Sequence, residues 1–463
     1  MKVEQIYTSC LSQGAYFIES NGEAAVIDPL REISNYLKLA EDSNSKIKYV
    51  FETHFHADFI SGHLTLANKT GAKIVYGPQA DPNFESIIAE DNQVFKIGAV
   101  TITAIHTPGH TLESTSYILK DENGKEHCIF TGDTLFLGDV GIPDVAQRYM
   151  GVSKEELAGI LYESVNNRIK PLPDNILVYP GHGAGSACGK NMMKETVDTL
   201  KNQKKINYAL NGSFSKEGFV KELTDNLPEP PTYFPSNVKL NQEGYLDFDK
   251  VLERGLIPLE LEKFISLSSQ ENTIILDVRN QNIFKNGFVP GSIFIGLNGG
   301  FAPWVGAVLK DINIKILLVC EESQAKEAIM RLSRVGFDNC LGYLKGGFKT
   351  WQNSSNPIDI IDSKSAKEFE KSINDNINIL DVRQVGERNN GYLKNSEHIP
   401  LALIDSDNKS LNKSLKYHIH CAGGYRSMIA CSILKKNGFD NTIDIEGGFG
   451  SISNNTSLEI LQN

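Results

Sequence analysis

The chain has 463 residues, of which 40% are hydrophobic and 22% charged, and its formal net charge is −11 at pH 7. This length is too great for one hydrophobic core and predicts roughly two to four globular domains. The acidic balance, without any basic stripe, excludes nucleic acid as a partner, and no apolar run reaches the roughly 20 residues of a membrane span.

In the first half of the chain, short β-branched runs alternate with loops and helical stretches, a pattern typical of an α/β fold. Asn21 and Gly22 stand between two such runs, and this dipeptide predicts a β-hairpin. Further strand-like runs begin at Tyr49, Ala72, Val100, Cys128 and Asn175. A proline-rich stretch at Pro228 indicates the end of a domain. We therefore place the first domain at residues 1–235 and a linker or docking arm at residues 236–256.

The second half contains an internal repeat. Residues 275–279 (Ile-Leu-Asp-Val-Arg) recur as residues 379–383, about 100 residues later. A Gly-Phe-Asp-Asn segment and a Gly-Gly-Phe segment recur at nearly the same spacing. Each unit has the length and the alternating strand and helix pattern of one small α/β domain. We therefore predict two related domains, at residues 257–355 and 356–463.

Histidines and aspartates follow four of the strand-like runs in the first half. They are His54, His56 and Asp58, then His110, Asp133 and His182. Strand ends with glycine-containing turns are the usual place for a site on an α/β scaffold. Imidazoles and carboxylates are ligands that suit zinc or iron. Taken together, these residues predict a metal site. The segment of residues 54–58 alone would also fit a polar loop.

In order and spacing these residues resemble the metallo-β-lactamase superfamily, and the resemblance covers residues 1–231. It implies a four-layer αβ/βα sandwich with the metal at one edge. The binuclear hydrolases of that superfamily carry a further histidine directly after the aspartate, but here this position is Phe59, which cannot bind a metal. His63 lies too far along the chain to replace it, and we interpret it as a core or helix-surface histidine. The sequence therefore favours a mononuclear site.

Among mononuclear members, the chain resembles the persulfide dioxygenases, which bind iron. Carried over to this chain, the implied ligands are His54, His110 and Asp133. Two histidines and one carboxylate form the open facial set of non-haem Fe(II) oxygenases. The resemblance thus implies one Fe(II) per chain, with zinc as the alternative, and open positions for a persulfide sulfur and O2. The residues expected beside the ligands, to orient them or as further ligands, are His56, Asp58 and His182.

Two further positions bear on substrate contacts. Ile142 stands where many persulfide dioxygenases carry arginine, so contacts there depart from the family pattern. Cys188 lies six residues after His182, which places it near the entrance of the iron site. Two interpretations of Cys188 stay open, a second persulfide carrier and a buried structural cysteine.

A second constellation lies in the last domain, between an apolar run that ends at Ile419 and a helical pattern that begins at Met428. It is a loop with Cys421 and Arg426, whose other members are Ala422, Gly423, Gly424, Tyr425 and Ser427. Glycines let several backbone N–H groups point at one centre, and the helix start adds a positive dipole end. That environment stabilises a thiolate or persulfide on Cys421, and Arg426 adds a charge for sulfite or thiosulfate.

This loop, with the upstream Leu-Asp-Val-Arg and the downstream Gly-Gly-Phe, resembles the active loop of the rhodaneses, the thiosulfate sulfurtransferases. Four residues separate Cys421 from Arg426, as in the short, sulfur-handling form of the loop. In the first repeat, Cys320 stands near the matching position, but two carboxylates follow it directly. Carboxylates raise the pKa of a neighbouring thiol and repel anions. We therefore expect the first repeat to be inactive and the second to be active.

Together these features predict an α/β fusion enzyme that detoxifies sulfide. The first domain oxidises a low-molecular-weight persulfide with O2 and water to sulfite and a thiol. The last domain joins a sulfane sulfur on Cys421 to sulfite, which makes thiosulfate. The thiol (glutathione, coenzyme A, bacillithiol or another) and the physiological direction of the rhodanese step stay open.

Two alternatives belong to other classes. One is a glyoxalase II-like zinc thioesterase with a rhodanese passenger, which Phe59 disfavours. The other is a non-enzymatic sulfur carrier with a decayed metal domain, which the complete ligand set disfavours.

The seven cysteines have no framework spacing and indicate reduced thiols. With no secretory pattern at the N-terminus, we expect a cytoplasmic protein, and we expect it to form a homo-oligomer.

Overall fold

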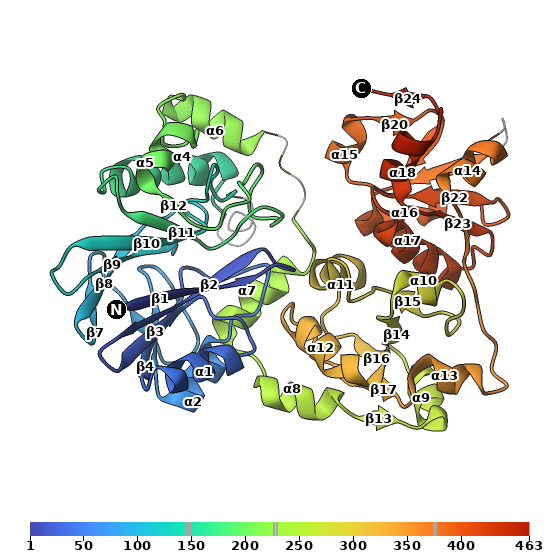
Figure 1. Cartoon of the computed structure of the whole chain (residues 1–463), viewed down its shortest axis with the longest axis horizontal. Coiled ribbons are helices and arrows are strands. Elements are labelled where there is room, and N and C mark those ends of the chain that lie inside the picture. Colours follow the sequence, from blue (N-terminus) through green and yellow to red (C-terminus); the bar gives the residue numbers. More distant parts are fainter. Residues whose placement is uncertain (144–150, 226, 228–229, 374–376, 463) are drawn as a thin grey trace. The chain divides into compact units, whose positions relative to one another are not determined.

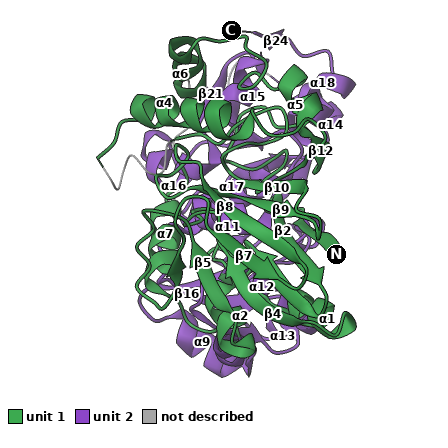
Figure 2. Cartoon of the chain, turned by 90° about the vertical axis from the view of Figure 1, so that its left-hand side faces the viewer, with its two compact units in different colours: residues 1–248, 333–336 green, residues 249–332, 337–463 purple. Residues whose placement is uncertain are grey.

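The computed structural model describes residues 1–143, 151–225, 227, 230–373 and 377–462. The chain forms two compact units, one of Met1–Phe248 with Ser333–Gly336 and one of Asp249–Leu332 with Phe337–Asn463 (Figure 2). Pro228, where the sequence predicts a domain end, lies outside the described residues. The segment expected as a linker falls largely in two helices, α7 (Phe234–Glu243) and α8 (Phe248–Gly255).

The first unit contains two six-stranded sheets. One has the order β1-β2-β3-β4-β5-β6 and consists of β1 (Lys2–Thr8), β2 (Gln13–Ser20), β3 (Glu23–Ile27), β4 (Lys46–Phe51), β5 (Lys73–Tyr76) and β6 (Ile87–Ile88). The other has the order β12-β11-β10-β9-β8-β7 and consists of β7 (Val94–Ile97), β8 (Val100–His106), β9 (Thr115–Lys120), β10 (Glu126–Gly132), β11 (Leu177–Pro180) and β12 (Asp198–Thr199). The predicted hairpin at Asn21 and Gly22 joins β2 to β3, and both residues have positive φ (50° and 78°), as a two-residue turn needs.

One hydrophobic core lies between the two sheets, where rings such as Phe51, Tyr117 and Phe130 are fully buried. The outer face of the first sheet is covered by α1 (Ser34–Asp42) and α2 (His63–Thr70). The outer face of the second is covered by α4 (Lys154–Ser164), the π-helical turn Val165–Ile169, α5 (Leu200–Ile206) and α6 (Lys216–Thr224) (Figure 1). The unit is therefore a four-layer αβ/βα sandwich, which confirms the predicted fold.

The two repeats of the second unit form two parallel five-stranded sheets. The first has the order β13-β17-β16-β14-β15, with β13 (Pro258–Leu259), β14 (Thr273–Asp277), β15 (Ile293–Phe294), β16 (Lys315–Val319) and β17 (Cys340–Leu344). The second has the order β18-β23-β22-β19-β21, with β18 (Asp362–Lys364), β19 (Asn378–Asp381), β21 (Ser396–His398), β22 (Tyr417–His420) and β23 (Thr442–Ile445). The strand orders correspond one to one, which confirms the internal repeat.

Helices flank both of these sheets. Those of the first repeat are α9 (Leu261–Ser268), α10 (Gln281–Phe284), α11 (Phe301–Leu309), α12 (Glu322–Ser333) and α13 (Gly347–Gln352). Those of the second are α14 (Ala366–Ser372), α15 (Val385–Asn389), α16 (Ile404–Asp407), α17 (Tyr425–Lys436) and α18 (Gly448–Asn455), with 3-10 turns at Leu401–Leu403 and Asn408–Ser410. A two-stranded sheet pairs β20 (Tyr392–Leu393) with β24 (Ile460–Leu461). Among the described helices, none is long and apolar enough to cross a membrane.

The recurring Leu-Asp-Val-Arg segment has a structural role in both repeats. Arg279 Nη2 donates to Asp277 Oδ2 over 2.6 Å, and Arg383 Nη2 donates to Asp381 Oδ2 over the same distance. Both aspartates are fully buried, so each needs the charge-assisted bonds of its arginine. In each repeat the central strand, β16 or β22, then runs directly into a cysteine.

Candidate metal centre and sulfur-transfer loop

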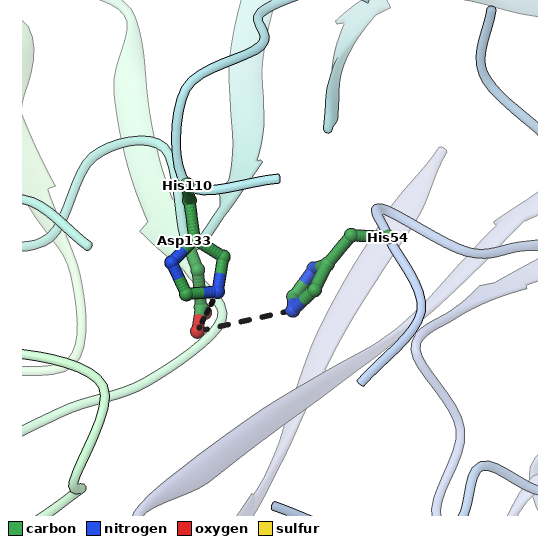
Figure 3. A group of neighbouring side chains, drawn as sticks. All are labelled: His54, His110 and Asp133. Atoms are coloured by element: carbon green, nitrogen blue, oxygen red, sulfur yellow. Dashed lines mark ion pairs between the residues drawn. The ribbon is translucent and has the colours of Figure 1, made fainter. Parts of the chain in front are cut away.

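His54, His110 and Asp133 converge at the strand ends of the first unit, after β4, β8 and β10. Asp133 Oδ2 lies 3.9 Å from His54 Nε2 and 3.6 Å from His110 Nε2. Dashed lines mark both pairs in Figure 3. All three side chains are buried, and Asp133 Oδ2 has no hydrogen-bond donor among the described residues. A buried carboxylate oxygen without a donor is costly. A cation between the two imidazoles would satisfy it, so this donor set fits a metal ion.

Hydrogen bonds fix the protonation pattern of both imidazoles. His110 Nδ1 lies 2.7 Å from the carbonyl oxygen of Ile142, which can only accept, so Nδ1 carries the proton. Thr53 Oγ1 donates to Asp28 and lies 3.0 Å from His54 Nδ1, so its remaining lone pair accepts the His54 proton. In both histidines the Nε2 lone pair is therefore free to bind a metal.

His182 links two carboxylates at this site. Its Nδ1 lies 2.7 Å from Asp133 Oδ1 and its Nε2 lies 2.8 Å from Asp58 Oδ2. Burial lowers the pKa of His182, but Asp133 and Asp58 together raise it more, so the pKa lies well above its usual range. Burial raises the pKa of Asp133, but His182, His54 and His110 lower it well below its usual range. His182 thus holds Oδ1 of Asp133 and leaves Oδ2 facing the other two histidines.

The glycines around Asp133 are needed because other backbone and side-chain atoms approach closely. A Cβ at Gly181 would lie 2.6 Å from Asp133 Oδ1, and a Cβ at Gly141 would lie 2.0 Å from the Asp133 carbonyl oxygen. Contacts of this kind cannot be accommodated without moving the backbone. The turns that follow the strands therefore determine how the ligands converge.

His56 faces two buried carboxylates, Asp28 and Glu52, which do not belong to the histidine motif. Its Nε2 lies 3.1 Å from Asp28 Oδ1 and 3.5 Å from Glu52 Oε2. Asp28 and Glu52 directly follow β3 and β4, so an acidic residue just after a strand was the signal available in the sequence. The Phe59 ring packs on His56, with centroids 4.3 Å apart, and is fully buried. Phe59 therefore fills the space beside His56 with apolar surface.

Two other residues of the first unit are buried as well. His63 begins α2 and is fully buried, and burial lowers its pKa to about 3, as for a core histidine. Cys188 lies beside Asp58 and His182, with the ligand atoms of all three within 4.8 Å of one another. Its carbonyl accepts a hydrogen bond from the N–H of Ile142, whose own carbonyl faces His110. Ile142 thus joins the Cys188 segment to a candidate ligand.

In the second unit, Cys421 stands at the end of β22, in a loop that leads into α17. The N–H of Gly424 donates to Cys421 Sγ over 3.1 Å, and Ser427 Oγ lies 3.7 Å from the sulfur. A Cβ at Gly448 would lie 2.4 Å from the carbonyl oxygen of Cys421, so the Gly-Gly-Phe segment packs directly behind the loop. The N–H donor and the start of a 12-residue helix stabilise negative charge on this sulfur. Ala422, Gly423 and Tyr425 complete the loop.

Arg426 contacts the carboxylate of Glu387, which the sequence motifs do not identify. Its Nη1 and Nη2 donate to Glu387 Oε2 and Oε1, each over 2.6 Å. The ring of Trp304, on α11 of the first repeat, lies 5.8 Å from the Arg426 guanidinium carbon. Burial lowers the pKa of Arg426, but Glu387 and the neighbouring Cys421 raise it more. Arg426 therefore interacts electrostatically with both Glu387 and Cys421.

The first repeat also contacts the loop through Tyr425. The Tyr425 hydroxyl donates to the carbonyl oxygen of Gly296 over 2.6 Å, and its ring packs near Phe294. A Cβ at Gly299 would lie 2.3 Å from the Tyr425 ring. The first repeat thus contacts the loop of the second through a hydrogen bond and through ring packing.

The cysteine of the first repeat lies in a different environment. Cys320 is fully buried, and burial, with Cys340 and nearby carboxylates, raises its pKa to about 12. The helix α12 begins two residues after it, at Glu322, whereas α17 begins four residues after Cys421. The seven cysteines all lie in the described part of the chain, and none of them forms a disulfide bond.

Sequence comparisons match both halves of the chain to known families. Residues 9–182 match the metallo-beta-lactamase superfamily, and residues 260–354 and 365–455 each match the rhodanese-like domain. A hydroxyacylglutathione hydrolase from Dictyostelium discoideum is 37% identical over 171 residues, 35% of this chain and 59% of that protein. The mitochondrial persulfide dioxygenase ETHE1 of Mus musculus is 30% identical over 211 residues, 45% of this chain and 74% of that protein.

A solved structure covers more of the chain than either relative. A metallo-beta-lactamase from Staphylococcus aureus aligns with a TM-score of 0.66 and 30% identity, over 74% of this chain and 98% of that one. The chain spans only part of some of these relatives, 60% of a probable hydroxyacylglutathione hydrolase of Schizosaccharomyces pombe and 59% of the one of Dictyostelium discoideum. The chain belongs to the metallo-beta-lactamase superfamily, and two rhodanese-like domains follow its metallo-beta-lactamase domain.

Proposed function

We propose that the first unit is a mononuclear Fe(II) persulfide dioxygenase and that the second unit joins a sulfane sulfur to the sulfite produced. The observation that carries the proposal is the buried set of His54, His110 and Asp133, with one orphaned carboxylate oxygen facing two free imidazole nitrogens. Two histidines and one carboxylate are the ligand set of non-haem Fe(II) oxygenases. Bound there, ferrous iron would supply the redox capacity for the reaction of a persulfide with O2.

The surrounding residues orient this set. Ile142 and Thr53 hold the Nδ1 atoms of His110 and His54, so that both Nε2 atoms face Asp133. His182, anchored by Asp58, holds Asp133 in place. Phe59 and Ile142 are buried apolar side chains that exclude water from this side of the site. Orientation of this kind is what neighbours of metal ligands contribute.

The two reactions balance as separate steps. In the first, a persulfide R–S–SH, O2 and water give R–SH, sulfite and two protons. In the second, sulfite attacks the outer sulfur of the Cys421 persulfide, the S–S bond breaks, and thiosulfate leaves the Cys421 thiolate behind. The N–H of Gly424 and the α17 N-terminus stabilise that thiolate. The small-molecule partners are thus a persulfide, O2, sulfite and thiosulfate.

A glyoxalase II-like zinc thioesterase is the second candidate, because hydroxyacylglutathione hydrolases are among the relatives. Phe59 argues against it, since this buried ring occupies the position of a histidine ligand in the binuclear hydrolases and packs on His56. A thioesterase would contain two zinc ions and would hydrolyse thioesters without consuming O2.

Anaerobic purification with iron and zinc quantitation separates the two candidates. We expect about one iron per chain and O2 uptake that depends on a persulfide. His110→Ala should lose both the iron and the O2 uptake, because it removes a ligand. His127→Ala is the matched control, because His127 is exposed and lies outside the cluster. Two zinc ions per chain with thioester hydrolysis would refute the dioxygenase.

A further inference from the structure

Arg426, the cationic side chain of the sulfur-transfer loop, forms an ion pair with Glu387. Both terminal nitrogens of Arg426 donate to the Glu387 carboxylate, each over 2.6 Å, in the two-point geometry that arginine and carboxylate favour. An oxyanion that binds at this loop needs the same nitrogens. Thiosulfate must therefore share Arg426 with Glu387 or displace it.

Glu387 is held in this position independently of Arg426. It is the third residue of α15, and its Oε2 accepts the backbone N–H of Gln384 over 2.9 Å in a capping box. Burial raises the pKa of Glu387, but the bonds from Arg426 and Gln384 lower it more, so the carboxylate stays ionised at neutral pH. Its negative charge is thus a fixed part of the loop's surroundings.

The first repeat lacks this carboxylate. Glu387 follows Arg383 by four residues, and the residue in the same place after Arg279 is Ile283. The Ile283 side chain is 57% exposed and has no charge to offer. Glu387 is therefore present in the repeat that has the cysteine loop and the arginine. The fold that both repeats share does not require it.

We propose that Glu387 is a specificity-determining residue of the sulfur-transfer site, which acts through Arg426 to disfavour thiosulfate as the sulfur donor relative to an organic persulfide. Thiosulfate carries two negative charges next to its sulfane sulfur, whereas the persulfide group of R–S–S⁻ carries one. An ionised Glu387 offsets the charge of Arg426 and repels the dianion more strongly. The site then accepts sulfane sulfur from persulfides and releases thiosulfate readily. This inference rests on the proposed sulfur transfer by Cys421.

The test is Glu387→Gln in the full chain, with thiosulfate or an organic persulfide as donor and cyanide as acceptor. The Cys421 thiolate attacks the sulfane sulfur of the donor, whose bond to the rest of the donor breaks and releases sulfite or the thiol. Cyanide then takes this sulfur from the Cys421 persulfide and leaves as thiocyanate. Glutamine keeps an oxygen for the Gln384 N–H but removes the charge. We expect the KM for thiosulfate to fall about tenfold, with kcat little changed and the KM for the persulfide within about twofold. Inhibition by sulfate should strengthen in parallel.

Two further variants make the result specific. Glu387→Asp keeps the charge and should retain the high KM for thiosulfate, and Glu397→Gln, which removes an exposed carboxylate of the same repeat, should change neither KM. An unchanged KM for thiosulfate in Glu387→Gln, or an equal fall in both KM values, would overturn the inference. If wild type formed no thiocyanate from either donor, the sulfur transfer itself would be refuted instead.

Discussion

The two repeats of the second unit have the same strand order and the same buried aspartate–arginine pair, yet only one presents a thiol in a setting that stabilises a thiolate. After Cys421 the chain makes a loop before α17 begins, and the N–H of Gly424 reaches the sulfur. After Cys320 the helix α12 begins two residues later, and the pKa of that buried thiol is raised to about 12. Chemistry thus depends on a few loop residues, while the scaffold is shared.

The first repeat nevertheless contributes to the site of the second. The Tyr425 hydroxyl is bound by its Gly296 carbonyl, and Trp304 lies beside Arg426. These contacts give the first repeat a way to position the loop of its neighbour. The substitutions below separate loop chemistry from this support.

Cys421→Ser should have the largest effect. Serine keeps the size of the side chain but is a far weaker nucleophile at neutral pH, so transfer from thiosulfate to cyanide should fall at least about a thousandfold. The measurement is thiocyanate formation, with thermal unfolding as the control for folding. Transfer at the wild-type rate would mean that another cysteine carries the sulfur, with Cys188 the first to test.

Arg426→Ala should come next, because it removes the only arginine of the loop and leaves Cys421 in place. Loss of a charge-assisted contact predicts a fall in kcat/KM for thiosulfate of roughly ten- to a hundredfold. Arg426→Lys should recover part of the activity, since it restores the charge without the two-point geometry. Activity equal to wild type in Arg426→Ala would show that the oxyanion binds elsewhere.

Gly299→Ala tests the support from the first repeat. The added Cβ would lie 2.3 Å from the Tyr425 ring, so the loop must shift, and we expect a loss of roughly three- to tenfold in kcat/KM. Gly386→Ala is the matched control, because nothing lies within 4 Å of its Cβ. If both variants transfer sulfur equally well, the contact with Tyr425 has no role in the reaction.

Cys320→Ser should have the smallest effect. At a pKa of about 12 this thiol stays protonated at neutral pH. Thiocyanate formation should therefore stay within about twofold of wild type. A large loss in a variant that folds normally would contradict the assignment of the first repeat as inactive.

Much of the fold and the strand-end placement of the candidate residues could be predicted, because strands, tight turns and motif spacing are local signals. The hairpin at Asn21 and Gly22 is one example. The bridge that His182 makes between Asp58 and Asp133 could not be predicted, since it depends on how distant strands align. Glu387, far from Arg426 in the sequence, belongs to no spacing pattern that would have linked the two.

The supporting carboxylates of the first unit were missed for a related reason. Asp28 and Glu52 follow neighbouring strands, as the candidate ligands do, but neither belongs to the histidine motif. Only the parallel pairing of β3 with β4 brings both carboxylates to His56. A residue that acts by contact across a sheet leaves little trace in the sequence around it.

The most direct test of the account is the sulfur product formed per O2 consumed, in wild type and in Cys421→Ser. The candidate metal ligands lie in the first unit and Cys421 in the second, so the substitution should leave persulfide-dependent O2 uptake unchanged. With excess persulfide, wild type should release mainly thiosulfate, whereas Cys421→Ser should release free sulfite in its place. Undiminished thiosulfate from Cys421→Ser, or loss of O2 uptake in a folded variant, would contradict the claim that persulfide oxidation and sulfur transfer are separate steps carried out by the two units.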